Sequence, residues 1–284
     1  ASPSGSLSPG SPGPSQNSSP EPTASPTSDA IDHPTGATDV ILRLAEGGGF
    51  VPMEFSASQA PVFTLYGNGV VVFQQSIVSF PPPDGQGVVR GVPWRTAKLD
   101  ETQVQELLAF ALGPGGLAIA RADYRSDMVA DAATSTFTVR AGGLDKTVAV
   151  YALFEEVQPG PDGPARKAFF QLAQRLRDFD RGGSIASDVY QPERYRGVLI
   201  ETGGGIGGKP VAWPWPGLKP ADFTAGAGDG TSGTTFPHRT MTAQEVAALG
   251  LGDVPGGAQG MFLTGPDGKT YSFILRPLLA DEKD

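Results

Sequence analysis

Residues 61–73, PVFTLYGNGVVVF, carry the pattern that decides the fold, because two short apolar runs flank the sequence Gly67-Asn68-Gly69. Val, Phe, Thr and Tyr favour strands. Asn-Gly accepts the positive φ angles of a type I′ turn. The stretch therefore predicts a tight β-hairpin, and residues 39–45 have the composition of a strand that precedes it.

Residues 99–114, LDETQVQELLAFALGP, predict an amphipathic helix. Asp100 can cap its first turn while Gln103, three residues on, returns the hydrogen bond. Gly113 and Pro114 end it. The apolar residues fall on one face, and they are Val104, Leu107, Leu108, Ala111 and Leu112.

The rest of the chain alternates strands with two more helices. A second capping box, Thr242 with Glu245, opens a short helix after Met241. Residues 181–184, RGGS, separate two halves. The other predicted elements are strands over 134–140, 146–153 and 195–201, a helix over 164–179 and a hairpin over 260–276.

Both halves contain a capped helix followed by two strands, so either an internal duplication or chance explains the likeness. We predict an α+β fold, β-rich with many Gly/Pro turns, in which one or two amphipathic helices cover each antiparallel sheet. The expected first domain covers residues 39–182 and the second covers 188–284. The two either fold separately or share one core.

Composition excludes several classes of protein. The 284 residues include 39 Gly and 27 Pro, which argues against a helical bundle, and no Cys, which excludes disulfides and thiol-ligated metals. A net charge of −9 disfavours nucleic acid as a partner. The chain lacks an apolar run of the ~18 residues that a membrane span needs.

Residues 1–38 have the composition of a disordered tether. The first 28 contain 10 Ser and 7 Pro, and Glu21 is the only charged residue before Asp29. Such a segment cannot bury enough apolar surface to fold. The chain lacks an initiator Met, which indicates a processing boundary. The tether leads us to expect export, either with ordinary signal-peptide cleavage or with a lipid anchor. A spacer of this kind follows the lipid-modified Cys of bacterial lipoproteins, and that residue would stand just before Ala1.

Several strings resemble a family of uncharacterised secreted proteins and lipoproteins of actinobacteria and related bacteria. They are residues 63–70, 123–124, 129–134 and 137–139, the Trp213-Pro-Trp-Pro216 cluster and the closing 270–279, together with the helix from Leu99. The resemblance covers most of residues 39–284 and implies export and a β-rich fold. It implies no activity.

Three aspartates are the candidate metal ligands. Asp123, Asp127 and Asp131 recur every four residues, so they would share one helix face or could gather in a loop around calcium. The spacing differs from the calcium-binding loop of EF-hands. Solvated loop carboxylates are the alternative.

Aromatic residues are the best signal for non-catalytic binding. Trp213 and Trp215 alternate with prolines, and Tyr195 opens a strand. Flat rings at a surface stack on sugars or contact partner segments. The alternative is that both tryptophans fix an irregular loop to the core.

No cofactor is predicted. Glycines at 203, 205 and 208 match a dinucleotide fingerprint, but the following KPVAWPWP cannot form the required helix. His33 and His238 lack a serine-triad context.

Three functions remain open. The first is a non-catalytic cell-envelope module that binds an envelope protein or a wall polymer and touches the membrane only through an N-terminal lipid. The second is a secreted hydrolase that uses carboxylates or a metal. The third is a structural spacer or an inhibitor-like protein.

Overall fold

The predicted hairpin forms, with a turn other than the one expected. In the computed structural model, β2 (Phe63–Tyr66) pairs antiparallel with β3 (Val70–Phe73) across a three-residue loop. Gly69 has φ +82°, whereas Asn68 does not have a positive φ. The type I′ prediction is therefore wrong. The loop matches the three-residue class that ends in a left-handed glycine, and the Asn68 side chain accepts a hydrogen bond from the Val70 amide (3.0 Å).

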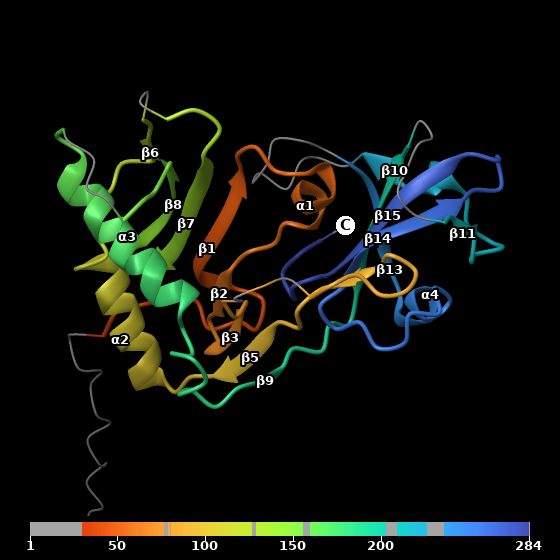
Figure 1. Cartoon of the computed structure of the whole chain (residues 1–284). Coiled ribbons are helices and arrows are strands. Elements are labelled where there is room, and N and C mark those ends of the chain that lie inside the picture. The colour runs from red at the N-terminus through yellow and green to blue at the C-terminus, as the bar shows by residue number, and fades with distance from the viewer. Residues whose placement is uncertain are drawn as a thin grey trace, which may run out of the picture. The chain divides into compact units, whose positions relative to one another are not determined.

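The fold is α+β and β-rich, as predicted, and its sheets are mainly antiparallel (Figure 1). The structure describes residues 30–76, 79, 81–126, 129–155, 160–202, 209–225 and 236–283. Residues Ile31–Asp284 form one compact unit. Within it, the boundary predicted between residues 182 and 188 separates most strands of one sheet from most strands of the other.

The first sheet has eight strands in the order β6-β8-β7-β1-β2-β3-β5-β9. All neighbours pair antiparallel except β6 and β8, which are parallel. The remaining strands are β1 (Val40–Gly48), β5 (Arg95–Lys98), β6 (Asp123–Tyr124), β7 (Ala133–Ala141), β8 (Leu144–Tyr151) and β9 (Asp188–Val189).

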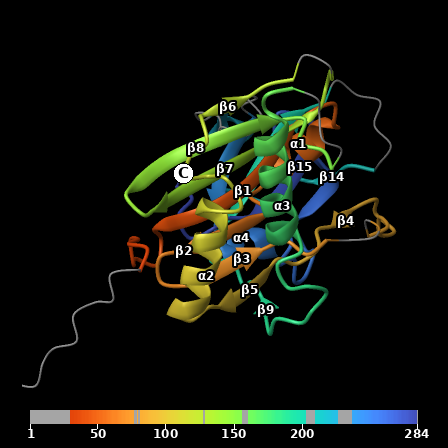
Figure 2. The same cartoon turned by 90° about the vertical axis from the view of Figure 1, so that its left-hand side faces the viewer.

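Two amphipathic helices cover one face of this sheet, as Figure 2 shows. The first, α2 (Glu101–Leu112), begins at the predicted capping box of Asp100 and Gln103. The second, α3 (Gly163–Arg177), places Phe169 and Leu172 against the strands. The predicted helix and strand residues thus form the larger hydrophobic core.

The second sheet has the order β11-β14-β15-β10-β13-β12, and β4 also pairs with β14. The helix α4 (Ala243–Ala247) begins at the predicted Thr242–Glu245 capping box and packs Val246 into a second core. The strands are β4 (Val89–Arg90), β10 (Tyr195–Glu201), β11 (Val211–Ala212), β12 (Thr224–Ala225), β13 (Pro237–Met241), β14 (Ala258–Thr264) and β15 (Thr270–Pro277), and a 3-10 turn covers Pro220–Asp222.

The two halves exchange segments. From the first half, β4 joins the second sheet and α1 (Met53–Ser58) packs Ala57 against Val198 and Ile274 of that sheet. From the second half, β9 joins the first sheet, and Leu279 packs with Tyr66, Val72 and Trp94 on its other face. Each sheet is therefore completed by the other half of the chain.

The strand–helix–hairpin likeness of the halves does not extend to sheet pairing. In the first sheet, β1 pairs with β7, the first strand of the hairpin that follows α2. In the second sheet, β10 pairs with β15, the second strand of the hairpin that follows α4. This difference in strand order argues against a simple duplication.

The compact unit begins earlier than the boundary at residue 39 that composition indicates. The side chain of Gln105 on α2 holds both backbone groups of Ile31, at 2.8 and 3.0 Å. The Gly142 amide donates to the carbonyl of Asp32 (2.8 Å). Residues 1–29, to which the rest of the tether prediction applies, lie outside the described residues.

Replacing Gly69 by Ala should lower the free energy of unfolding by at least about 1–3 kcal/mol, the cost of a strained backbone conformation. The reason is twofold: φ is +82°, and an added Cβ would lie 2.6 Å from the Leu99 carbonyl oxygen. Urea unfolding measures the loss.

Gly143→Ala is the matched control, because Gly143 has φ +74° and no heavy atom within 4 Å of an added Cβ. It should retain more stability than Gly69→Ala. Equal losses would show that the close approach to Leu99 contributes nothing.

Candidate functional site

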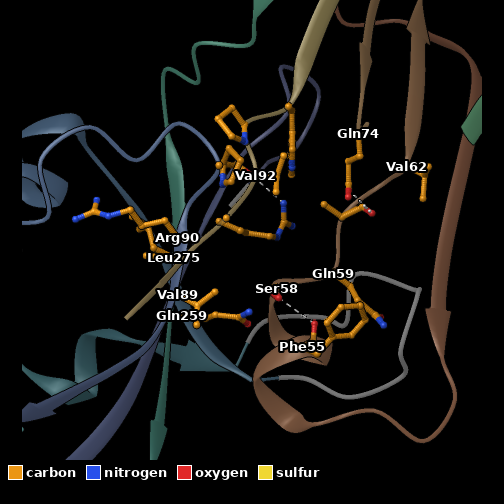
Figure 3. Close-up of a pocket in the computed structure, with 18 of the residues that line it drawn as sticks. Phe55, Ser58, Gln59, Val62, Gln74, Val89, Arg90, Val92, Gln259 and Leu275 are labelled. Atoms are coloured by element: carbon orange, nitrogen blue, oxygen red, sulfur yellow. Dashed lines mark hydrogen bonds between the residues drawn. The ribbon is translucent and has the colours of Figure 1, made fainter. Parts of the chain in front are cut away.

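A cavity of about 440 Å³ lies between the two sheets. Figure 3 shows Arg90, Val89 and Gln259 on one wall, opposite Gln74 and Val62. The size falls in the range of about 300–1,000 Å³ that is typical of small-ligand sites. We call it the cleft. It is lined by residues of both sheets and of α1, and it is the candidate functional site.

The helix α1 supplies one end of the cleft. It follows Pro52 and has no side-chain cap, so its position depends on the packing of Ala57 against the second sheet. That packing directs Phe55, Ser58 and the following Gln59 to the cleft. Phe55 is 39% exposed, so part of an apolar ring is accessible at this end.

Each charged side chain that lines the cleft already has a protein partner. Glu46 forms an ion pair with Arg177 of α3 and accepts a hydrogen bond from Ser135 (2.8 Å). Arg90 donates to the Leu251 carbonyl (2.5 Å), and its guanidinium lies 4.0 Å from the Asp84 carboxylate. Arg276 forms an ion pair with Glu282, described below. These pairs leave little net charge to attract an ionic ligand.

The lining glutamines fall into two kinds. Gln74 donates to the carbonyls of Ala60 (3.3 Å) and Pro61 (3.1 Å), and Gln75 donates to Asp180 (2.6 Å), so both hold loops in place. The side-chain oxygen of Gln59 is buried without a hydrogen-bond partner in the described structure. The Gln259 side chain likewise makes no hydrogen bond to a described residue. The side-chain amide nitrogens of Gln59 and Gln259 make no hydrogen bond to a described residue, so they are available to donate to a ligand carbonyl.

A buried ion pair fixes the wall formed by β15. Arg276 is 3% and Glu282 14% exposed at the side chain, and their oxygens and nitrogens lie 2.6 and 2.9 Å apart. Burial raises the pKa of Glu282, but the hydrogen bonds and charge of Arg276 and the Leu279 amide outweigh it. The net effect holds the pKa of Glu282 below its ordinary value of 4.5.

The predicted aromatic residues lie away from the cleft, in the core under α4. Trp215 is 4% and Tyr195 8% exposed. The Trp215 indole donates to the Glu245 carbonyl (2.8 Å), and the half-buried Trp213 donates to the Leu218 carbonyl (2.9 Å). The two rings meet edge to face at 5.1 Å. Their contacts assign both tryptophans a packing role, and a ligand-binding role stays a prediction.

The structure describes two of the three predicted metal ligands, Asp123 and Asp131. Asp123 is exposed on β6 and pairs with Arg125 (2.8 Å), and Asp131 is exposed with φ +54°. Asp127 lies outside the described residues, as does the glycine stretch 203–208. Among the residues that the structure does describe, no group of three or more His, Asp or Glu side chains could hold a metal ion. The metal site stays a prediction.

Comparisons with known proteins add no relative: no family model, no curated protein and no solved structure matches this chain. In the described part of the chain, none of the helices has the length and apolar character needed to cross a membrane.

Sequence reasoning missed the residues of the cleft. Gln59 follows a short uncapped helix, and Gln259 is the second residue of β14 in an ordinary hairpin. Neither belongs to a motif. The sequence signal nearest to the cleft is a group of apolar residues, Phe50, Met53 and Phe55, that follows three glycines, and only Phe55 of these lines the cleft.

Glu282→Gln should lower the free energy of unfolding at pH 7 by about 3–5 kcal/mol, because it leaves the buried Arg276 without a countercharge. Folding depresses the pKa of Glu282. The ionised carboxylate therefore stabilises the fold above pH 4.5, and this stabilisation is lost as the pH falls through the folded-state pKa. The stability gap between the wild type and the variant should therefore narrow below about pH 4.5.

Denaturant unfolding between pH 7 and pH 3 measures this gap. Glu193→Gln is the control, because Glu193 is exposed. A gap of constant size across this range would contradict a depressed pKa at Glu282.

Proposed function

We propose that the protein is an exported, non-catalytic module of the cell envelope that binds a partner in the cleft. The observation that carries the proposal is the pair of carboxamides, Gln59 and Gln259, which line a cavity of about 440 Å³ without hydrogen-bond partners among the described residues. Binding sites commonly combine apolar walls with a few such polar groups.

The cleft favours binding over hydrolysis. Glycoside hydrolysis needs two carboxyl groups about 5–10 Å apart across the bond to be cut. Among the described lining residues, Glu46 is the one carboxylate, and Arg177 and Ser135 occupy its oxygens. A hydrolase at this site would need an acid that these residues do not supply.

Three features support an envelope location. The first 28 residues are rich in Ser and Pro, the net charge is −9, and the sequence resembles exported actinobacterial proteins. A tether of this composition would hold the compact unit away from a membrane while leaving the cleft accessible. The partner is either an envelope protein or a wall polymer.

A thermal-shift panel of wall fragments, polysaccharides and peptides tests the binding function. A ligand at a hundred times its dissociation constant stabilises the fold by about 2.7 kcal/mol. For a unit of this size that corresponds to a rise of roughly 5–10 °C in Tm. We expect at least one member of the panel to give such a rise without being chemically altered.

The variant Ala60→Trp, which adds a large ring at a lining position, should abolish the rise. Ala247→Trp, at an exposed position on α4, is the matched control and should retain it. A rise that persists in Ala60→Trp would place binding elsewhere, and turnover of a panel member would contradict the non-catalytic assignment.

A further inference from the structure

The cleft contains a strand edge that no described strand covers. On one side, β1 pairs with β7 from Leu42 to Gly48. On the other side, it pairs with β2 only as far as Leu44, because β2 begins at Phe63 opposite that residue. The strand β1 therefore continues beyond its second partner, and Glu46 and Gly47 of this extension line the cleft.

The unpaired edge presents backbone groups to the cleft. The Leu44 carbonyl accepts from the Val62 amide (2.9 Å), so the backbone groups of Leu44 point away from β7. In a strand, alternate residues direct their amide and carbonyl to the same side. The amide and carbonyl of Glu46 therefore face the side where no described strand follows.

Three kinds of group thus converge on the cleft: the Glu46 backbone, the two unpartnered carboxamides of Gln59 and Gln259, and an apolar surface. Carboxamides and strand edges each offer a donor and an acceptor, which is the complement of a peptide bond. The apolar surface consists of Phe55, Val62, Val89, Val92 and Leu275.

We infer that the partner enters the cleft as an extended, uncharged peptide segment. It adds to the edge of β1 at Glu46, its backbone carbonyls on the other side accept from the side-chain amides of Gln59 and Gln259, and an apolar side chain enters between Phe55 and Val89. Strand addition of this kind combines main-chain hydrogen bonds with a side-chain pocket. The inference rests on the proposed binding function and names its ligand class.

The same contacts disfavour a glycan. Sugars stack on open aromatic faces, but Trp94, the one tryptophan that lines the cleft, is 6% exposed and stacks on Tyr190. The lining charges are neutralised within the protein, so an ionic peptide would lose hydration without gaining a counterion. A neutral peptide meets neither difficulty.

A random nine-residue phage-display library, selected on the full chain, supplies the probe, and fluorescence anisotropy measures the synthesised peptide. We expect apolar, uncharged sequences. Gln59→Ala and Gln259→Ala should each weaken binding by about tenfold to a hundredfold, the effect of one lost buried hydrogen bond. Neither variant removes a hydrogen bond within the described protein, so both should fold like the wild type. Gln86→Ala, exposed and outside the cleft, should bind normally.

N-methylation along the peptide separates strand addition from other modes of binding. Because alternate amides of an added strand face β1, methylation should weaken binding at every second residue. A uniform response, or binding that both Gln variants leave unchanged, would overturn the inference. The inference would also be overturned if N-acetylglucosamine oligomers bound and the Ala60→Trp variant abolished that binding. The proposed function would stand in that case. If the wild-type protein bound neither peptides nor wall fragments, both the inference and the proposed function would be overturned.

Discussion

The exchange of segments between the two halves is the constraint on which the cleft depends. The strand β4 and the helix α1 cross from the first half to the second sheet, and the segment after β15 returns to the first. Asp281 in that segment accepts from Arg43 of β1 (2.6 Å) and from the Tyr66 hydroxyl (2.7 Å). Burial and the nearby Asp281 raise the pKa of Tyr66, so the phenol stays protonated and donates. The cavity walls are therefore fixed by polar contacts outside it.

The sequence predicted those elements whose boundaries are set by local chemistry. The capping boxes of α2 and α4 satisfy the same backbone donors in an isolated segment as in the fold, so their first residues could be located. The strand β10 was predicted with its observed ends, Tyr195 and Glu201, because β-branched and aromatic residues fill it. These elements build the two cores.

The elements that build the cleft could not be predicted, because tertiary contacts alone specify them. The helix α1 has no cap, and β4 is two residues long and pairs with a strand far along the chain. The turn at Asn68 also differs from expectation, since its side chain bonds the Val70 amide and only Gly69 adopts a positive φ. Local propensity cannot register the long-range contacts that place α1 and β4. The turn differs for a local reason, because the choice between turn classes depends on this side-chain hydrogen bond.

The contrast between the tryptophans and the glutamines is the reason for placing the proposed binding site in the cleft. The indole N–H groups of Trp213 and Trp215 both donate to backbone carbonyls, as is typical of tryptophans that pack in a core. Gln59 and Gln259 retain hydrogen-bonding capacity on a concave apolar surface. Their side-chain amide nitrogens can donate to a carbonyl in the cleft, and the tryptophan N–H groups cannot, because they are already bonded. The proposal of a peptide ligand rests on this difference.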